Sequence, residues 1–109
     1  RLFYFYNGGR EDVFLSSADW MPRNLNERVE LMIPVEGRRH KERVKAILDL
    51  YLNDNQKAHI MRADGSYRKI IAKEGLLSAQ EELMRLAKKG QKPKKMTDSE
   101  RFQPMLGAD

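Results

Sequence analysis

Cysteine is absent from the 109 residues, and histidine occurs only twice. Without a thiol the chain has no disulfide framework, no thiolate nucleophile and no cysteine ligand for a metal. Neither His40 nor His59 has a partner at catalytic or metal-binding spacing, so both are interpreted as surface residues. A Gly-rich phosphate loop, a cluster of metal ligands and a carboxylate pair are also missing from the sequence. These absences indicate that the chain carries no nucleophile of its own.

Long hydrophobic runs are missing as well, because no stretch approaches the roughly 20 apolar residues that span a bilayer. No signal peptide is visible, so a soluble intracellular protein is expected. The length suits one domain with a small core. Residues 2–6 are continuously apolar or aromatic and predict a central strand covered on both faces. Since such a strand needs neighbours, we interpret the chain as a fragment of a larger protein.

Positive charge is unevenly distributed along the chain, whose formal net charge is +5. Residues 1–36 carry four arginines and six carboxylates, whereas residues 37–109 carry 17 basic and 10 acidic side chains. This imbalance supports one hypothesis, a non-catalytic module that binds a polyanion or nucleic acid. Five lysines between Lys88 and Lys95 account for much of the excess, and residues 91–109 are interpreted as a basic, flexible tail.

Turn residues and hydrophobic periodicity predict five strands and two longer helices. The strands are expected over residues 2–6, 12–16, 28–35, 57–63 and 67–72, and the helices over residues 38–52 and 79–89. Tight turns are predicted at Asn7-Gly8-Gly9 and at Asp64-Gly65.

Several packing expectations follow from these elements. The strand over residues 28–35 should bury alternate apolar side chains and point Arg28 the opposite way. Ser78 and Glu81 match a capping box at the start of the last helix. Trp20, the only tryptophan, is interpreted as core packing rather than as a platform for base stacking. The helix over residues 38–52 should bury the stripe Val44, Ile47, Leu48 and Tyr51.

The polar stretch over residues 16–28 lies between two apolar strands and is the strongest candidate for a functional site. It combines hydroxyl, carboxylate and amide groups with two arginines, Arg23 and Arg28. Guanidinium groups beside hydroxyls and amides suit an oxyanion, and phosphate in particular. The alternative is a simple strand connection in which the arginines pair with Asp19 and Glu27.

The order of amino acids in this stretch is more specific than the kinds of chemical group that it contains. The run SSADWMPRNLNERVE closely resembles the C-terminal part of bacterial polyphosphate kinase, which makes polyphosphate from ATP. The upstream FYFYNGG and the downstream RVELMIPVEG and DGSY match the same family in order and spacing. The resemblance is dense over residues 1–52, looser to about residue 87 and weak beyond.

The resemblance implies an α+β fold, a mixed β-sheet with two flanking helices. Residues 1–90 would form part of a phospholipase-D-like C-terminal domain. It also implies reversible transfer of the ATP γ-phosphate to polyphosphate through a phosphohistidine. The phosphorylated histidine and a second histidine that faces it lie outside this chain, the second two residues before Arg1. The isolated chain is therefore expected to be inactive.

The family pattern also implies roles for individual residues. Arg1 stands at the lysine of the phospholipase-D signature His-x-Lys, and Ser17 and Asp19 stand at the serine and asparagine of Gly-Ser-x-Asn. Asp19 would support the upstream histidine, and Arg28 matches the arginine that reaches the phosphate tunnel. The residues assigned to phosphate or ATP are Arg1, Arg28, Ser17, Arg23 and Asn24.

Structural alternatives stay open for these residues. Asp19 could cap a short helix and Ser17 could make a local turn bond. Arg28 could pair with Glu27 or Glu30. The remaining two, Arg23 and Asn24, could hold the loop together.

Cofactor, partners and location are implied by the family alone. Mg²⁺ would accompany ATP, with no ligands visible in this chain, and the partners would be ATP or ADP and polyphosphate. A homo-oligomer in the cytoplasm is implied, with peripheral membrane association as a variant, and no nucleic acid is expected. The remaining alternative is a phospholipase-D-like phosphodiesterase or nuclease, against which Arg1 in the lysine position counts.

Overall fold

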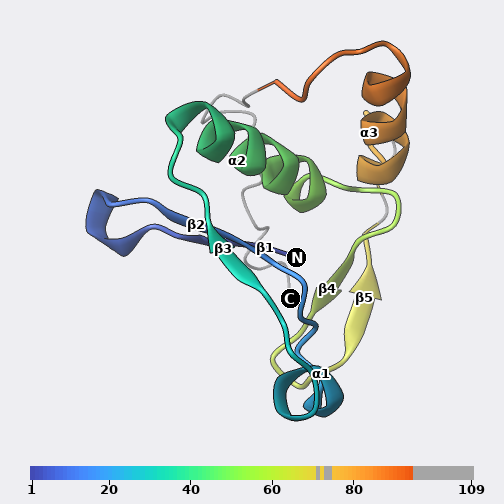
Figure 1. Ribbon diagram of the computed structural model, residues 1–109. Coiled ribbons are helices and arrows are strands. Elements are labelled where there is room, and N and C mark those ends of the chain that lie inside the picture. The colour runs from blue at the N-terminus through green and yellow to red at the C-terminus, as the bar shows by residue number, and fades with distance from the viewer. Residues whose placement is uncertain (71, 73–74, 95–109) are drawn as a thin grey trace. The chain divides into compact units, whose positions relative to one another are not determined.

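The protein combines antiparallel strands with helices, which confirms the predicted α+β class (Figure 1). The computed structural model describes residues 1–70, 72 and 75–94. Its elements in chain order are β1 (Leu2–Phe5), the 3-10 helix η1 (Asn7–Gly9), β2 (Asp12–Ser16), α1 (Pro22–Asn26), β3 (Met32–Pro34), α2 (Arg38–Leu52), β4 (His59–Met61), β5 (Tyr67–Lys69) and α3 (Ala79–Lys88). No helix in the described ranges is long and apolar enough to cross a membrane.

The chain divides into two compact units, Arg1–Lys45 and the described part of Ala46–Asp109. Helix α2 begins in the first unit and ends in the second. The boundary expected at residue 90 stays a prediction, and most of the expected basic tail, residues 95–109, lies outside the described residues.

The first unit is built on a three-stranded antiparallel sheet with β2 in the centre. Tyr4 of β1 pairs with Val13, and Leu15 of β2 pairs with Ile33. The side chain of Val13, on the central strand β2, is only 2% exposed. Within the described residues β1 has a neighbour on one side only, so its expected place as a central strand of a larger protein stays a prediction.

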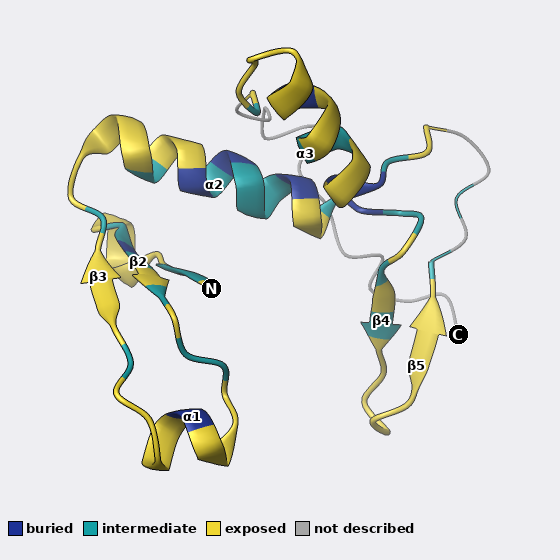
Figure 2. Cartoon of the chain, turned by 45° about the vertical axis from the view of Figure 1, so that its right-hand side comes forward, coloured by how far each residue is buried: buried dark blue, intermediate teal, exposed yellow. Residues whose placement is uncertain are grey.

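Strand β3 is shorter than predicted, and the expected burial of its apolar residues is wrong. Val29 is fully exposed, and Leu31 and Ile33 are 67% and 54% exposed (Figure 2). The reason is that residues 28–31 belong to a loop closed against Ser17, so the strand starts only at Met32. Pro34 ends this edge strand, as its missing N–H predicts.

A polar cluster ties the first half of α2 to the β1–β2 hairpin. Lys45 Nζ and the Tyr4 hydroxyl both donate to Oε1 of Glu11, the hydroxyl at 2.9 Å, and Lys41 Nζ donates to the Glu11 carbonyl at 2.6 Å. The hydrogen bond from Lys45 lowers the pKa of Glu11, and the same bond raises the pKa of Lys45. Burial, together with the bond to Glu11, raises the pKa of Tyr4. The cluster therefore favours a charged Glu11–Lys45 pair beside a neutral phenol.

The second unit has a small apolar core. Leu50 of α2 packs with Ala79 and Leu86 of α3, and partly buried Leu77 and Leu83 surround them. The buried stripe of α2 differs from the predicted one, since Tyr51 is 49% exposed while Leu50 is buried. The helix turns Leu50 rather than Tyr51 toward α3.

The start of α3 is capped by a distant residue instead of the predicted capping box. Ser78 is the N-cap, but its hydroxyl oxygen is buried and makes no hydrogen bond in the described part of the chain. The Asp54 carboxylate accepts instead from the backbone nitrogens of Ala79 (2.9 Å), Gln56 (3.0 Å) and Lys57 (2.7 Å). The capping box is therefore wrong, because a long-range carboxylate already occupies this helix end.

Candidate phosphate-binding loop

Residues 17–31, here the 17–31 loop, connect β2 to β3 and contain most of the sequence-predicted site residues. The loop closes on itself, because the Ser17 nitrogen donates to the Leu31 carbonyl at 3.0 Å and the Leu31 nitrogen donates to the Ser17 hydroxyl oxygen at 3.0 Å. Between these ends α1 begins at Pro22, whose missing N–H and fixed φ suit a first helical position. Met21 is its N-cap, so Asp19 does not cap this helix.

Glu30 holds the inside of the loop together. One oxygen of its carboxylate accepts a hydrogen bond from the Ser17 hydroxyl, and the other accepts from Asn24 Nδ2 at 3.3 Å. Asn24 is only 6% exposed, so its amide is directed inward. Sequence reasoning considered Glu30 only as a partner for Arg28 and missed this role. The loop is thus fixed by a carboxylate that binds two of the predicted phosphate ligands.

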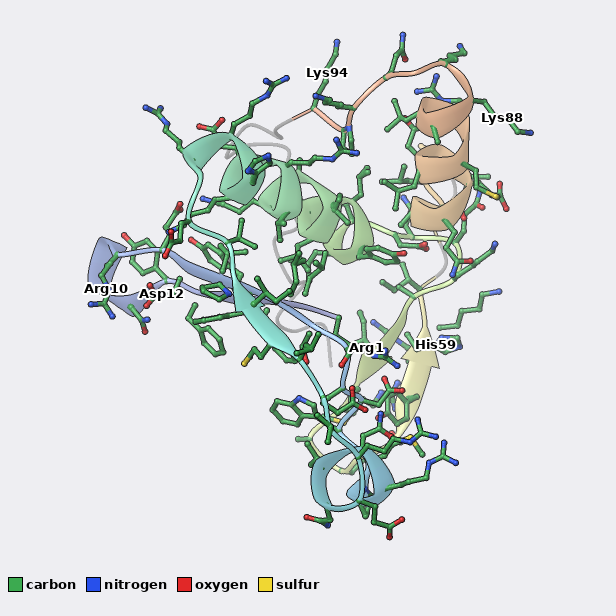
Figure 3. All side chains as sticks on the ribbon, viewed as in Figure 1. Arg1, Arg10, Asp12, His59, Lys88 and Lys94 are labelled. Carbon is green, nitrogen blue, oxygen red and sulfur yellow. The ribbon has the colours of Figure 1, made fainter. Side chains whose placement is uncertain are left out.

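Arg1 and Asp19 form a two-pronged ion pair beside the loop. The guanidinium donates through Nε and Nη2 to the two carboxylate oxygens of Asp19, and through Nη1 to the Ser17 carbonyl at 2.9 Å (Arg1 is labelled in Figure 3). The Ser16 nitrogen also donates to the Arg1 carbonyl at 2.9 Å. Both side chains are nearly half exposed, so the pair contributes little stability but fixes the guanidinium plane.

Arg23 and Arg28 differ from the rest of the loop. Both are exposed, and neither guanidinium makes an ion pair or hydrogen bond with any of the described residues. The alternative in which Arg28 pairs with Glu27 or Glu30 is therefore not found in this structure. Two cations without counter-charges among the described residues thus lie on a loop whose shape is set by other residues.

Trp20 lies on the surface, and the prediction that it packs in the core is wrong. Its side chain is 81% exposed and stacks on Phe3, with ring centroids 6.1 Å apart and an interplanar angle of 21°. Phe3 belongs to the edge strand β1, which offers one aromatic neighbour and no enclosing layer within the described ranges. Most of the ring is therefore exposed, one residue after Asp19 in the sequence.

The loop offers guanidinium groups to a ligand more readily than hydroxyl or amide groups. Ser17 and Asn24 donate to a carboxylate, while Arg23 and Arg28 have no anionic partner among the described residues. A site of this kind suits an anion that guanidiniums recognise, such as phosphate. The described residues contain no group of three or more His, Asp or Glu side chains that could hold a metal ion.

Comparison with known proteins identifies relatives of this chain. The model of the family "Polyphosphate kinase C-terminal domain 2" matches residues 1–80. A polyphosphate kinase from Pseudomonas aeruginosa is 54% identical over 70 residues, which cover 64% of this chain and 10% of that protein. A polyphosphate kinase from Paraburkholderia phytofirmans is 56% identical over 70 residues, which cover 63% of this chain and 10% of that protein.

A solved structure extends the match to the fold. The crystal structure of the polyphosphate kinase from Porphyromonas gingivalis superposes with a TM-score of 0.68 at 37% identity, over 83% of this chain and 14% of that one. The chain spans about a tenth of the length of these curated relatives. The resemblance read from the sequence is confirmed, and the chain belongs to the polyphosphate kinase family, within its C-terminal domain 2.

Proposed function

We propose that this chain is the part of an ATP:polyphosphate phosphotransferase that neutralises phosphate charge through the 17–31 loop. Family membership supports the proposal, and one observation carries it: Arg23 and Arg28 are exposed without an anionic partner among the described residues. Because the chain spans about a tenth of its relatives, the activity itself belongs to a longer protein.

The reaction in this proposal proceeds in two displacements. A histidine outside the chain attacks the γ-phosphorus of ATP, so that an N–P bond forms, the bond to the β–γ bridging oxygen breaks and ADP leaves. A terminal phosphate oxygen of polyphosphate then attacks the phosphohistidine, forming a P–O bond and breaking the N–P bond. The same steps in reverse make ATP from ADP and polyphosphate.

In this proposal the chain's own residues stabilise the negative charge of the transferring phosphoryl group and orient the groups around it. Negative charge on the transferring group is stabilised by cations that are already in place, which saves reorganisation during reaction. Arg28 and Arg23 supply such cations, whereas the fork of Arg1 is engaged by Asp19 and would bind phosphate by exchanging that carboxylate for it. Asp19 would also support the histidine that the family places two residues before Arg1. Ser17 and Asn24 contribute by binding Glu30, and thereby shape the loop.

Magnesium does not fit the described residues of this site. Mg²⁺ prefers carboxylates and substrate phosphates as ligands. The oxygens of Asp19 accept hydrogen bonds from Arg1, and those of Glu30 from Ser17 and Asn24. We therefore assign the metal to the bound nucleotide.

Further properties of the longer protein rest on the family alone. We propose ATP, ADP and polyphosphate as its ligands, a phosphorylated histidine, a homo-oligomeric assembly and a cytoplasmic location with peripheral membrane association. Size-exclusion chromatography and fractionation of cells that express the full-length protein test assembly and location.

The test of the reaction uses ATP labelled in its γ-phosphate. A full-length polyphosphate kinase that carries this sequence should incorporate label into long acid-insoluble phosphate chains, and should release labelled ATP when ADP is added to those chains. The isolated chain of 109 residues is the control and should do neither, because the histidine lies outside it. Failure of the full-length protein to form labelled chains would contradict the proposed reaction.

A further inference from the structure

The β4–β5 hairpin, residues 59–69, carries Arg62, Arg68 and Lys69 against a single carboxylate, Asp64. Its strands pair antiparallel, with His59 opposite Lys69, Ile60 opposite Arg68 and Met61 opposite Tyr67 (His59 is labelled in Figure 3). Every side chain from residue 61 to residue 69 is exposed (Figure 2). The hairpin is thus a basic, solvated element and not part of the apolar core.

Two arginines lie on one face of this hairpin. Arg68 is opposite Ile60, and Arg62 follows Ile60 by two residues, so alternation places both guanidiniums on the same side. The backbone confirms the continued register, since the Arg62 nitrogen donates to the Ser66 carbonyl at 2.8 Å. By strand geometry the two positions are displaced by about 7 Å along the strands, within reach of one extended anion.

The described acidic residues around the hairpin do not neutralise this face. Asp64, at the turn, accepts from the Ser66 nitrogen at 2.8 Å, and hydrogen bonds from the Ser66 side chain and then from this nitrogen lower the pKa of Asp64. Glu81 pairs with Lys57 at 3.2 Å. Within the described residues neither Arg62 nor Arg68 forms an ion pair.

This arrangement costs stability in isolation. A two-stranded hairpin is marginal in water, and like charges gathered on it repel one another. When like charges gather on an element and the described residues do not neutralise them, a bound ligand of opposite charge is the natural explanation. Here that ligand must be anionic, extended and rich in oxygens that accept from guanidinium forks.

We propose that the Arg62–Arg68 face is a second contact for the phosphate chain of polyphosphate, separate in sequence from the 17–31 loop. The identity of the polyanion rests on the proposed function. The location of the binding face rests on charge complementarity between the two arginines and the phosphate chain. Phosphate chains carry a charge on every unit, so two arginines along the strands can bind several units at once. The face binds the chain without taking part in bond breaking.

The test measures binding of fluorescently labelled polyphosphate to the 109-residue chain across a series of salt concentrations. The variant Arg62→Gln/Arg68→Gln should weaken binding at least about tenfold at low salt, and should reduce the slope of log K against log salt by about 1 or more. The matched control is Arg39→Gln/Arg43→Gln on α2, which removes the same charge from two exposed arginines and should change binding less than about twofold.

Further variants separate the outcomes. Arg62→Lys/Arg68→Lys keeps the charge but not the guanidinium forks, so its affinity should lie between those of the wild type and the glutamine variant. The circular dichroism spectrum of the glutamine variant should match that of the wild type, which shows that its loss of binding is not due to unfolding. Equal losses in the hairpin variant and the α2 control would overturn the inference, as would a loss for single-stranded RNA but not for polyphosphate.

Failure of the inference can be distinguished from failure of the proposed function. If Arg28→Gln weakens polyphosphate binding while the hairpin variant binds like the wild type, the second contact is refuted and the loop assignment stands. If the wild-type chain does not bind polyphosphate at all, the inference is refuted, and the labelled-ATP experiment on the full-length protein decides the proposed function by itself.

Discussion

The side-chain carboxylate of Asp54 accepts a hydrogen bond from the backbone nitrogen of Ala79 at 2.9 Å, 25 residues further along the chain. Its other oxygen accepts from the backbone nitrogens of Gln56 and Lys57. One buried group therefore fixes both the turn that follows α2 and the start of α3. The side chain is 8% exposed. Asp54 is therefore the polar centre of the second unit.

Replacing Asp54 should destabilise the chain more than replacing an exposed aspartate. Asp54→Ala leaves buried backbone donors without an acceptor, which should lower the free energy of unfolding by about 2–3 kcal/mol. Asp64→Ala, which loses one exposed turn bond, is the control and should cost less than about 1 kcal/mol. Urea unfolding followed by circular dichroism measures both, and equal effects would show that Asp54 does not hold the unit together.

The same carboxylate should make stability depend on pH. Burial alone would raise the pKa of Asp54, but the backbone N–H bonds from Lys57, Ala79 and Gln56 outweigh it and the pKa is lowered. A carboxyl with a lower pKa in the folded state adds stability above its unfolded pKa of about 3.9, and loses that contribution as the pH falls through the folded pKa.

The stability difference between the wild type and Asp54→Asn should therefore be constant near neutral pH and shrink below about pH 4. Thermal melts of both proteins from about pH 7 to about pH 3 measure it. A difference that grows toward acid would contradict the assignment.

The bond between Ser17 and Glu30 should appear as an energetic coupling. A double-mutant cycle with Ser17→Ala and Glu30→Ala should give a coupling free energy of about 1 kcal/mol or more, because the two groups share one network with Asn24. The exposed pair Arg38–Glu42, at 3.1 Å on α2, is the control and should couple by no more than about 0.5 kcal/mol. Additive effects at Ser17 and Glu30 would mean that the carboxylate does not hold the loop.

The exposed edge of the three-stranded sheet should promote self-association of the isolated chain. Val29, Leu31 and Ile33 are more than half exposed on or beside the edge strand β3, and such edges pair with other chains. Ile33→Lys should reduce association, whereas Tyr67→Lys on β5 should not. Sedimentation velocity at several concentrations measures this, and a wild-type chain that stays monomeric throughout would refute the prediction.

Local patterns were enough to predict the elements that depend on nearby residues. The strand Asp12–Ser16 and the helix Arg38–Leu52 have the bounds expected from periodicity and from turn residues at their ends. The turn at residues 7–9 was also expected, and Asn7 there has a positive φ of 44°. These features are encoded within a few residues, where propensity and spacing carry the information.

Contacts between distant residues were not predictable in the same way. Asp54 displaced the capping box at Ser78, and Glu30 bound Ser17 from 13 residues away. Trp20 was expected in the core because of its hydrophobicity, but the sheet's edge leaves it exposed. In the candidate site, composition and the family resemblance both predicted the arginines, whereas the carboxylate that shapes their loop became visible only in three dimensions.

The most direct test of the central claim compares Arg28→Lys with the wild type in a full-length polyphosphate kinase that carries this sequence. Lysine keeps the charge but cannot copy the guanidinium's fork, so the rate of polyphosphate synthesis should fall at least about tenfold, roughly 1.4 kcal/mol of barrier. The melting temperature should stay nearly unchanged, because Arg28 is exposed and has no partner among the described residues.

Arg39→Lys, an exposed position on α2, is the control and should leave both the rate and the melting temperature unaltered. A tenfold slower Arg28 variant with an unchanged melting temperature is the result that the account predicts. Equal synthesis rates for all three proteins, or an Arg28 variant that simply unfolds, would contradict it.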